Sequence, residues 1–478
     1  ILYPDGNLVD LSTRQLVTNK LSNSKTHTYM RYIFFQILFT TTAFIFIQDI
    51  SIKAQESIKL SLVSCREMAL AQSESLQQAE HKYQQSQLDN KIATSAFLPK
   101  IEASGTGTYV FPDMDMMGMD LRMRGMYMAG ITLTQPLYAG GKIMTGKKLS
   151  KLGESIAAEQ KRMTMMDVLV EADNAYWTLI AVRQKVKMLD SYKEQMDSLY
   201  SQVKTAVGAG LSTENELLRI EASRSDILYQ IQKAKNGEDL CRMSLCRITG
   251  IDSNAELELT DTTIHVNEPG LLTADINGRP ELNLLKHQMD ATQKQIQMSR
   301  ANMLPTVGLV AGYTYYGNIK LNSMVDAGNG TMVPYSQEFR DGLGAVMLSI
   351  KIPIFEWGAN LKKVKKAKLD FKNAELELSR NSRLMTLEAQ SALRNVYDGY
   401  QLIRTAEVGL KQAEENLRVT NNKYNVSMAL LTDLLDAQSQ WKQAKSNLIE
   451  AQTQYKIYET EYLRATGRLN QNFSPDYQ

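Results

Sequence analysis

Two stretches of about 65 residues contain no proline, and they constrain the fold of this chain more than any other feature. They cover 142–206 and 358–424. A helix of that length extends for about 100 Å at 1.5 Å per residue, which exceeds the diameter of a compact domain. Apolar residues recur at helical spacing, as at Val168, Ala172 and Leu179. We therefore expect long helices that pack as coiled coils, and a generic coiled-coil rod would also satisfy this pattern.

The two stretches belong to an internal repeat with an offset of 217 residues. Pro136-Leu137-Tyr138 corresponds to Pro353-Ile354-Phe355, and Thr249-Gly250 corresponds to Thr466-Gly467. A fixed offset of this kind indicates a duplicated structural unit. Each half predicts the same order of elements: a helix, two strands, a very long helix, a tight turn and a second long helix.

The repeat predicts the division of the chain into segments. The first repeat is expected at 55–250, with a helix, a β-hairpin at 99–138 and long helices at 142–206 and 212–248. A linker is expected at 251–278. The second repeat is expected at 279–468, with a helix at 280–303, a hairpin at 305–355, long helices at 358–424 and 429–466, and a C-terminal tail at 469–478.

The first 54 residues have the order of an export signal. Met30-Arg31 precedes an apolar run over 32–47, and the small residue Ala54 follows a short polar stretch. This is the arrangement of a secretory signal peptide, so 30–54 is predicted to be one, cleaved after Ala54. Residues 1–29 would then not be part of the mature protein. A genuine N-terminal anchor helix is the alternative.

Leu62-Val63-Ser64-Cys65 resembles a lipoprotein cleavage box, so a lipid anchor at Cys65 is an alternative. The box lies far from the apolar run. We expect Cys65, Cys241 and Cys246 to be small helix-packing residues instead of a disulfide or a metal site.

Alternating apolar and polar residues predict four strands of about ten residues each, the length that crosses a bilayer when a strand is tilted. They are expected near 100–111, 126–138, 306–316 and 342–355, with long polar loops at 112–125 and 317–341. An open sheet edge cannot lie in lipid, since unpaired backbone groups cost several kcal/mol each. Four strands cannot close a barrel, so several chains would have to contribute. Two soluble hairpins capping a helical rod are the alternative.

A series of short motifs, in this order and duplicated, resembles the TolC family of outer-membrane efflux proteins over about 57–468. The motifs are Ala69-Leu70, Phe97-Leu98-Pro99, Gln135 to Gly141, Gly210-Leu211-Ser212, Arg279-Pro280-Glu281-Leu282, Met303-Leu304-Pro305, Ile352 to Gly358, Asp433 to Ala437 and the two Thr-Gly ends. The resemblance implies a mixed α and β membrane protein. It would be a homotrimer whose 12-stranded outer-membrane β-barrel continues into a long α-helical coiled-coil barrel in the periplasm.

The resemblance also implies partners and a gate at the periplasmic tip. The partners would be a periplasmic adaptor protein, an inner-membrane pump and outer-membrane lipid. The gate candidates are Tyr424, Asp433, Asp436 and Glu216. The candidates for adaptor docking at the two helix–helix turns are Gly208, Gly210, Leu211, Ser212, Ser427, Met428, Ala429 and Leu430.

The gate candidates differ from the family in one residue, and their acids have two interpretations. Ala429 occupies the position of a gate arginine in the family, so a closing salt bridge of that kind is not expected. Three symmetry copies of Asp433 or Asp436 around a narrow pore would form a negative ring that binds cations. Alternatively, the same acids simply stabilise a helix start through the helix dipole.

The remaining features favour a passive channel. The net charge of +2 gives no case for nucleic acid, and no residue set suggests an enzyme, a cofactor or a metal site. The lysines of 142–148 and 362–363 fit either a basic collar just below the membrane or a plain solvated helix start. We expect a passive conduit of a tripartite efflux or export system. The alternatives are an outer-membrane component of type I protein secretion and a periplasmic coiled-coil scaffold or adaptor.

Overall fold

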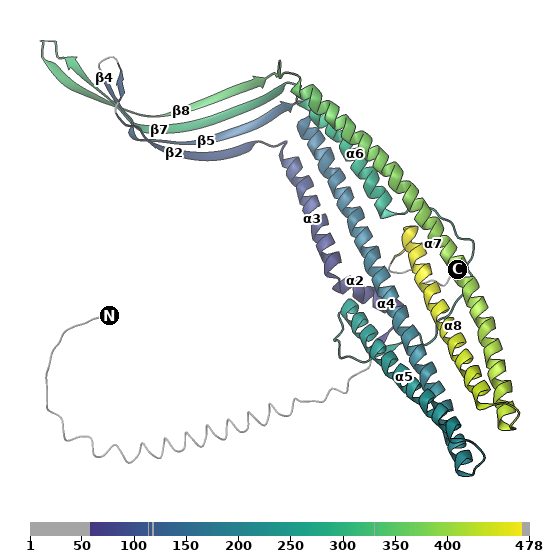
Figure 1. The fold of residues 1–478 in the computed structure, drawn as a ribbon. Coiled ribbons are helices and arrows are strands. Elements are labelled where there is room, and N and C mark those ends of the chain that lie inside the picture. Colours follow the sequence, from purple (N-terminus) through teal and green to yellow (C-terminus); the bar gives the residue numbers. More distant parts are fainter. Residues whose placement is uncertain (1–57, 113, 117–118, 329, 471–478) are drawn as a thin grey trace, which may run out of the picture. The chain divides into compact units, whose positions relative to one another are not determined.

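The computed structural model describes residues 58–470 except 113, 117–118 and 329 (Figure 1). The signal-peptide prediction for 30–54, the prediction for 1–29 and most of the expected tail lie outside the described residues. The described part consists of long helices and an antiparallel sheet, joined through short connections.

The helices in the described part of the chain number seven. They are α2 (Leu62–Gln72), α3 (Glu74–Ser95), α4 (Lys142–Gly208), α5 (Glu214–Thr249), α6 (Pro280–Ala301), α7 (Ala359–Asn425) and α8 (Leu431–Ala465). The sequence pattern missed α2 as a separate helix. Ser61 caps its N-terminus by accepting from the backbone N–H of Ser64, and Ser73 separates it from α3.

The two longest helices, α4 and α7, have 67 residues each, which corresponds to about 100 Å. Both begin after a glycine in the left-handed conformation, Gly141 with φ of 81° and Gly358 with φ of 73°. Glycine adopts this conformation at no steric cost, so the chain can turn sharply from a strand into a helix at both places. The helices α5 and α8 fold back along α4 and α7, respectively (Figure 1).

Three apolar clusters stabilise the helices along their length. One joins α2, α4 and α5 around Tyr176, and the next joins α4, α7 and α8 around Tyr455. The third lies near the helix turns and includes Met196, Ile220 and Leu434. At about 25 cal/mol per Å² of buried apolar surface, burial of such side chains gives the long helices the stability that they lack in isolation.

Buried hydrogen bonds to Asp173 of α4 connect α2, α4 and α8. The guanidinium of Arg66 donates to both carboxylate oxygens of Asp173, at 2.7 and 2.6 Å, and the hydroxyl of Thr460 donates to the same carboxylate at 2.9 Å. The side chains of Arg66 and Asp173 are only 2% and 0% exposed. A carboxylate so completely removed from water requires such partners.

The sheet has the strand order β2-β5-β7, with β8 also pairing β7, and all of these pairs are antiparallel. The strands are β2 (Lys100–Tyr109), β5 (Arg124–Ala139), β7 (Thr306–Asp326) and β8 (Met332–Lys351). A small hairpin of β3 (Met114–Met116) and β4 (Met119–Arg122) extends this sheet through a pairing of β4 with β7.

The expected long loops are wrong. The region 317–341 is mostly strand, because β7 and β8 pair from Thr306 with Lys351 to Asp326 with Met332. The region 112–125 contains β3 and β4. In contrast, β8 ends at Lys351, before the expected end at 355.

All four junctions between sheet and helices lie at one end of the sheet. The register pairs Lys100 with Thr134, Ala139 with Thr306 and Thr306 with Lys351, so the ends near α3, α4, α6 and α7 are adjacent (Figure 1). Most side chains of β8 are exposed in the single chain. They include the alternating apolar residues Val346, Leu348 and Ile350. A row of exposed apolar side chains of this kind is typical of a surface that contacts another protein or a membrane.

The segment expected as a plain linker, 251–278, contains the short strand β6 (Leu257–Leu259), which pairs with β1 (Ile58–Leu60). Its later part is fixed by tyrosines: the Tyr462 hydroxyl donates to the carbonyl of Thr273 at 2.9 Å. Of the helices described, none combines the length and the apolar character needed to span a membrane.

Candidate functional site

The turn between α4 and α5 forms one half of the candidate tip. Gly208 ends α4, and Gly210 follows in the left-handed conformation with φ of 72°. The amide of Leu211 donates to the carbonyl of Ala206 at 2.8 Å, which closes the helix end. The Leu211 side chain projects almost fully into solvent. This turn therefore presents a fixed backbone and an exposed apolar side chain.

The turn between α7 and α8 forms the other half. Ser427 has φ of 59°, which is uncommon for a residue with a side chain, and the amide of Met428 donates to the carbonyl of Lys423 at 2.8 Å. Met428 and Leu430 are exposed, whereas Ala429 is partly buried. The second turn thus resembles the first in offering exposed apolar side chains on a tightly bonded backbone.

The first gate candidate, Tyr424, is within electrostatic reach of the second, Glu216. Burial raises the pKa of the Tyr424 hydroxyl above its ordinary value, and the negative charge of Glu216 raises it further. The Ser212 hydroxyl donates to the Glu216 carboxylate. The charge of Glu216 at the start of α5 therefore acts on the tyrosine at the end of α7, and the tyrosine stays neutral at physiological pH.

The other two candidates, Asp433 and Asp436, lie on the first turns of α8 and are both exposed. Asp433 accepts from the backbone N–H of Leu430 at 3.1 Å, so it caps the start of its own helix. Asp436 lines a groove of about 560 Å³ together with Arg219 and Lys442. In the single chain, both aspartates therefore lie at the protein surface.

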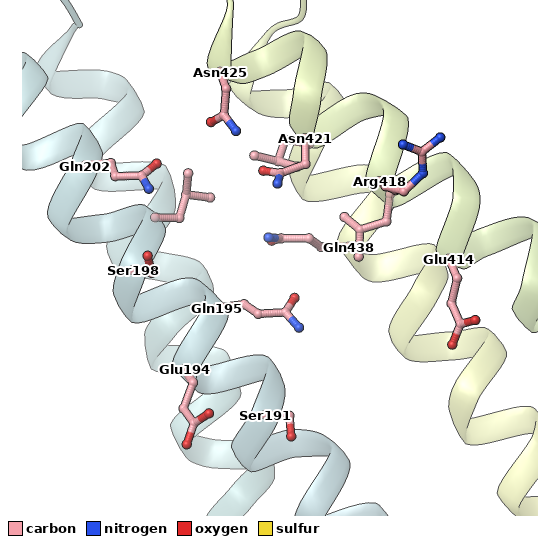
Figure 2. Close-up of a pocket in the computed structure, with 13 residues that line it drawn as sticks. Ser191, Glu194, Gln195, Ser198, Gln202, Glu414, Arg418, Asn421, Asn425 and Gln438 are labelled. Carbon is pink, nitrogen blue, oxygen red and sulfur yellow. The ribbon is translucent and has the colours of Figure 1, made fainter.

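A polar groove beside this tip was missed by the sequence interpretation. It has a volume of about 640 Å³ and lies between α4, α7 and α8, and Figure 2 shows its side chains. Gln438 extends between Gln195 and Asn421 and is only 5% exposed. Its side-chain oxygen has no hydrogen-bond partner among the described residues.

The signal for this groove was present but weak. Short polar residues recur on facing stretches of α4 and α7, at Gln195, Ser198 and Gln202 and at Asn421 and Asn425. At a spacing of three or four residues such side chains share a helix face. In an exposed coiled coil the same pattern is ordinary, so it does not by itself point to a groove.

The described residues contain no cluster of three or more His, Cys, Asp or Glu side chains arranged to hold a metal ion. The three cysteines are free. Cys65 is fully buried in the cluster around Tyr176, and burial raises the pKa of its thiol to about 12. In this fold the thiol is therefore shielded from solvent.

Comparisons with known proteins cover most of the chain. A family model described as outer membrane efflux protein matches residues 65–237 and 271–468. Outer membrane protein TolC of Escherichia coli (strain K12) is 23% identical over 433 residues, which cover 84% of this chain and 84% of that protein. Proteases secretion protein PrtF of Dickeya chrysanthemi is 21% identical over 437 residues, which cover 88% of this chain and 91% of that protein.

A solved structure shares the fold. The CmeC outer membrane channel of Campylobacter jejuni superposes with a TM-score of 0.72 and 17% sequence identity. The superposition covers 86% of this chain and 87% of that chain. The long helices and the antiparallel sheet are thus parts of one known architecture.

Proposed function

Because this chain belongs to the outer membrane efflux protein family and is an outer-membrane channel for efflux or export, we propose that three copies assemble into one passive conduit. The family is one of channels and not of enzymes. The channel lies in the outer membrane and extends into the periplasm. The observation that carries the proposal of assembly is the sheet, which has too few strands to close by itself.

Each chain would contribute four long strands to a shared barrel of 12. Within the described residues of the single chain, β2 and β8 pair with a neighbour on one side only, which leaves the other backbone edge of each strand for a second copy. Lipid cannot satisfy these backbone groups, and closure with neighbouring copies would do so. The exposed row of Val346, Leu348 and Ile350 would then face the acyl chains.

The helices would form a coiled-coil barrel below the membrane. Both halves of the chain present the order helix, strands, 67-residue helix and shorter helix, which supports an origin by duplication. The helix α7 also exposes the apolar side chains Leu376, Leu384 and Leu387, which packing against a neighbouring copy would cover.

The gate would lie at the tip formed by the two helix turns. Three copies of Asp433 or Asp436 would place a ring of negative charge around the pore, which favours cations. Tyr424 packs against the apolar cluster near the helix turns, which includes Ile220 of α5, and this packing would hold the end of α7 against the start of α5 within each copy.

Energy for transport would come from partners that dock at the same tip. The exposed apolar side chains Leu211, Met428 and Leu430, and the turn residues around them, offer a surface for a periplasmic adaptor protein. The adaptor would connect the conduit to an inner-membrane pump. Export of proteins is a second candidate function, supported by the similarity to PrtF, which is named as a protease secretion protein.

Cell fractionation tests the proposal. The full-length protein should sediment with outer membranes, resist extraction by salt and by alkali, and migrate as a heat-sensitive oligomer. Release of the protein by a salt or alkaline wash would indicate a periplasmic scaffold instead.

A further inference from the structure

The first ten residues of α7 carry a dense group of unpaired lysines. Lys362, Lys363, Lys365, Lys366 and Lys368 are all exposed. Within the described part of the chain, no carboxylate oxygen lies within 4.0 Å of any of these ammonium groups. Among the described residues, these lysines make one hydrogen bond, from Lys363 to the side chain of Asn360 at 3.4 Å.

The lysines do not stabilise the helix that carries them. The N-terminus of a helix bears a partial positive charge, so cations there are unfavourable and acids are favourable. The helices α5, α6 and α8 follow this rule with Glu214, Glu281 and Asp433 in their first turns. The first turn of α7 contains no acid, so the positive charge of the helix N-terminus and of the lysines would be stabilised by an anion from outside the chain.

The start of α7 has three faces, and one of them is free. Asn360 and Ala367 are buried against the body of the same chain, where α6 packs on α7. Leu361 and Leu369 are exposed on a second face, with Lys365 one helical turn from each, and a neighbouring copy is the proposed partner of this face. At about 100° per residue, Lys362, Lys363 and Lys366 lie within an arc of about 100° between these two faces.

An exposed aromatic segment comes directly before the lysines. Ile354, Phe355 and Trp357 are 92%, 69% and 87% exposed. The rings of Phe355 and Trp357 lie edge to face with centroids 5.0 Å apart. Trp357 has φ of 51°, a conformation that bulky residues rarely adopt, and it holds the ring away from the protein. Tryptophan with this exposure is typical of the boundary between lipid and water.

We propose that the segment 352–368 binds anionic phospholipid headgroups at the periplasmic surface of the outer membrane. The aromatic rings would lie at the boundary of the acyl chains, and Lys362, Lys363 and Lys366 would donate hydrogen bonds to the phosphates. The position fits, because β8 ends at Lys351 and the segment begins where the sheet ends. This inference rests on the proposed function, which places that end of the sheet at the membrane surface.

The test measures lipid affinity of the full-length oligomer in neutral detergent. Short-chain phosphatidylglycerol and phosphatidylcholine are titrated separately, and bound lipid is counted by native mass spectrometry. Each lysine near an anionic surface contributes about a five-fold change in affinity, so the variant Lys362→Gln/Lys363→Gln/Lys366→Gln should lose about 100-fold in affinity for phosphatidylglycerol. Its affinity for phosphatidylcholine should not change.

The matched control is Lys233→Gln/Lys235→Gln/Lys411→Gln, which removes the same charge from exposed positions away from the sheet. It should retain the affinity for phosphatidylglycerol, and Lys→Arg at 362, 363 and 366 should retain it as well. Equal affinity of the wild-type protein for both lipids would overturn the inference. So would an altered ion selectivity of the glutamine variant with unchanged lipid affinity, which would place the lysines in the pore.

Conductance of the wild-type oligomer in a planar bilayer distinguishes failure of the lipid site from failure of the proposed channel function. A conducting oligomer without a preference for phosphatidylglycerol rejects the lipid site and leaves the channel intact. A protein that neither inserts nor conducts rejects the proposed function itself.

Discussion

The buried ion pair of Arg66 and Asp173 allows a quantitative prediction for Asp173→Ala. The substitution leaves the Arg66 guanidinium, which is 2% exposed, without its bidentate partner. Removal of one member of a buried pair costs about 3–5 kcal/mol, because the remaining charge is uncompensated. The hydroxyl of Thr460 also loses its acceptor. We expect a loss of this size in the free energy of unfolding.

The assay is urea denaturation of the detergent-solubilised protein followed by helical circular dichroism, in a double-mutant cycle with Arg66→Ala. The double variant should be less destabilised than the sum of the single variants by about 0.5–3 kcal/mol, since it leaves no lone charge. A matched control is Glu171→Ala, which removes the exposed ion pair with Arg247 and should cost only about 0–1 kcal/mol. A cost below about 1 kcal/mol for Asp173→Ala would refute the reasoning, because desolvation would then not be limiting.

Three further predictions concern the pore, the barrel and the core. Asp433→Ala/Asp436→Ala should weaken cation preference and block by divalent cations in single-channel recordings, and unchanged selectivity would reject the acidic ring. Leu348→Arg should cost about 2–4 kcal/mol if the residue lies at the middle of the membrane, and should reduce the yield of heat-sensitive oligomers; normal assembly would contradict the facing of β8. Cys65 should resist a maleimide reagent at neutral pH, because its thiol is buried and protonated with a pKa of about 12. Since the folded state keeps this proton above the unfolded pKa of about 9, stability should fall as pH rises from 9 to 12, and a Cys65→Ala variant should lose part of that dependence.

The long helices and the strand pairs were predictable from local features. The absence of proline over 142–206 and 358–424 permits uninterrupted helices, and glycines at 141 and 358 permit the sharp turns that start them. Alternation in residues such as Val346, Leu348 and Ile350 predicts a strand because side chains of a strand point to opposite faces. These signals act within a few residues of one another.

The outer ends of β7 and β8 were not predictable in the same way. Beyond Tyr316 the strand β7 contains Asn318, Lys320 and Asn322, and the register shifts between Tyr316 and Ile319. Ile319 and Leu321 still alternate with these polar residues, but Gly317 and the register shift interrupt the apolar row. The pairing is maintained by backbone hydrogen bonds across to β8, which polar sequences form as readily as apolar ones.

The candidate site was predictable only in part. Similarity in the helix turns indicated Tyr424 and Glu216, and in the structure the charge of Glu216 raises the pKa of Tyr424. The buried position of Gln438, like the partnership of Arg66 and Asp173, depends on residues far apart in the chain. Charged and amide side chains on a helix normally face water, so their burial appears only when the neighbouring helices are in place.

Conductance of the purified protein in a planar bilayer is the direct test of whether several copies form one channel. We expect stepwise currents of uniform size from a detergent-purified oligomer, because the strands close into a barrel only when several copies meet. Absence of current steps from a protein that remains a monomer in detergent-free buffer would contradict it.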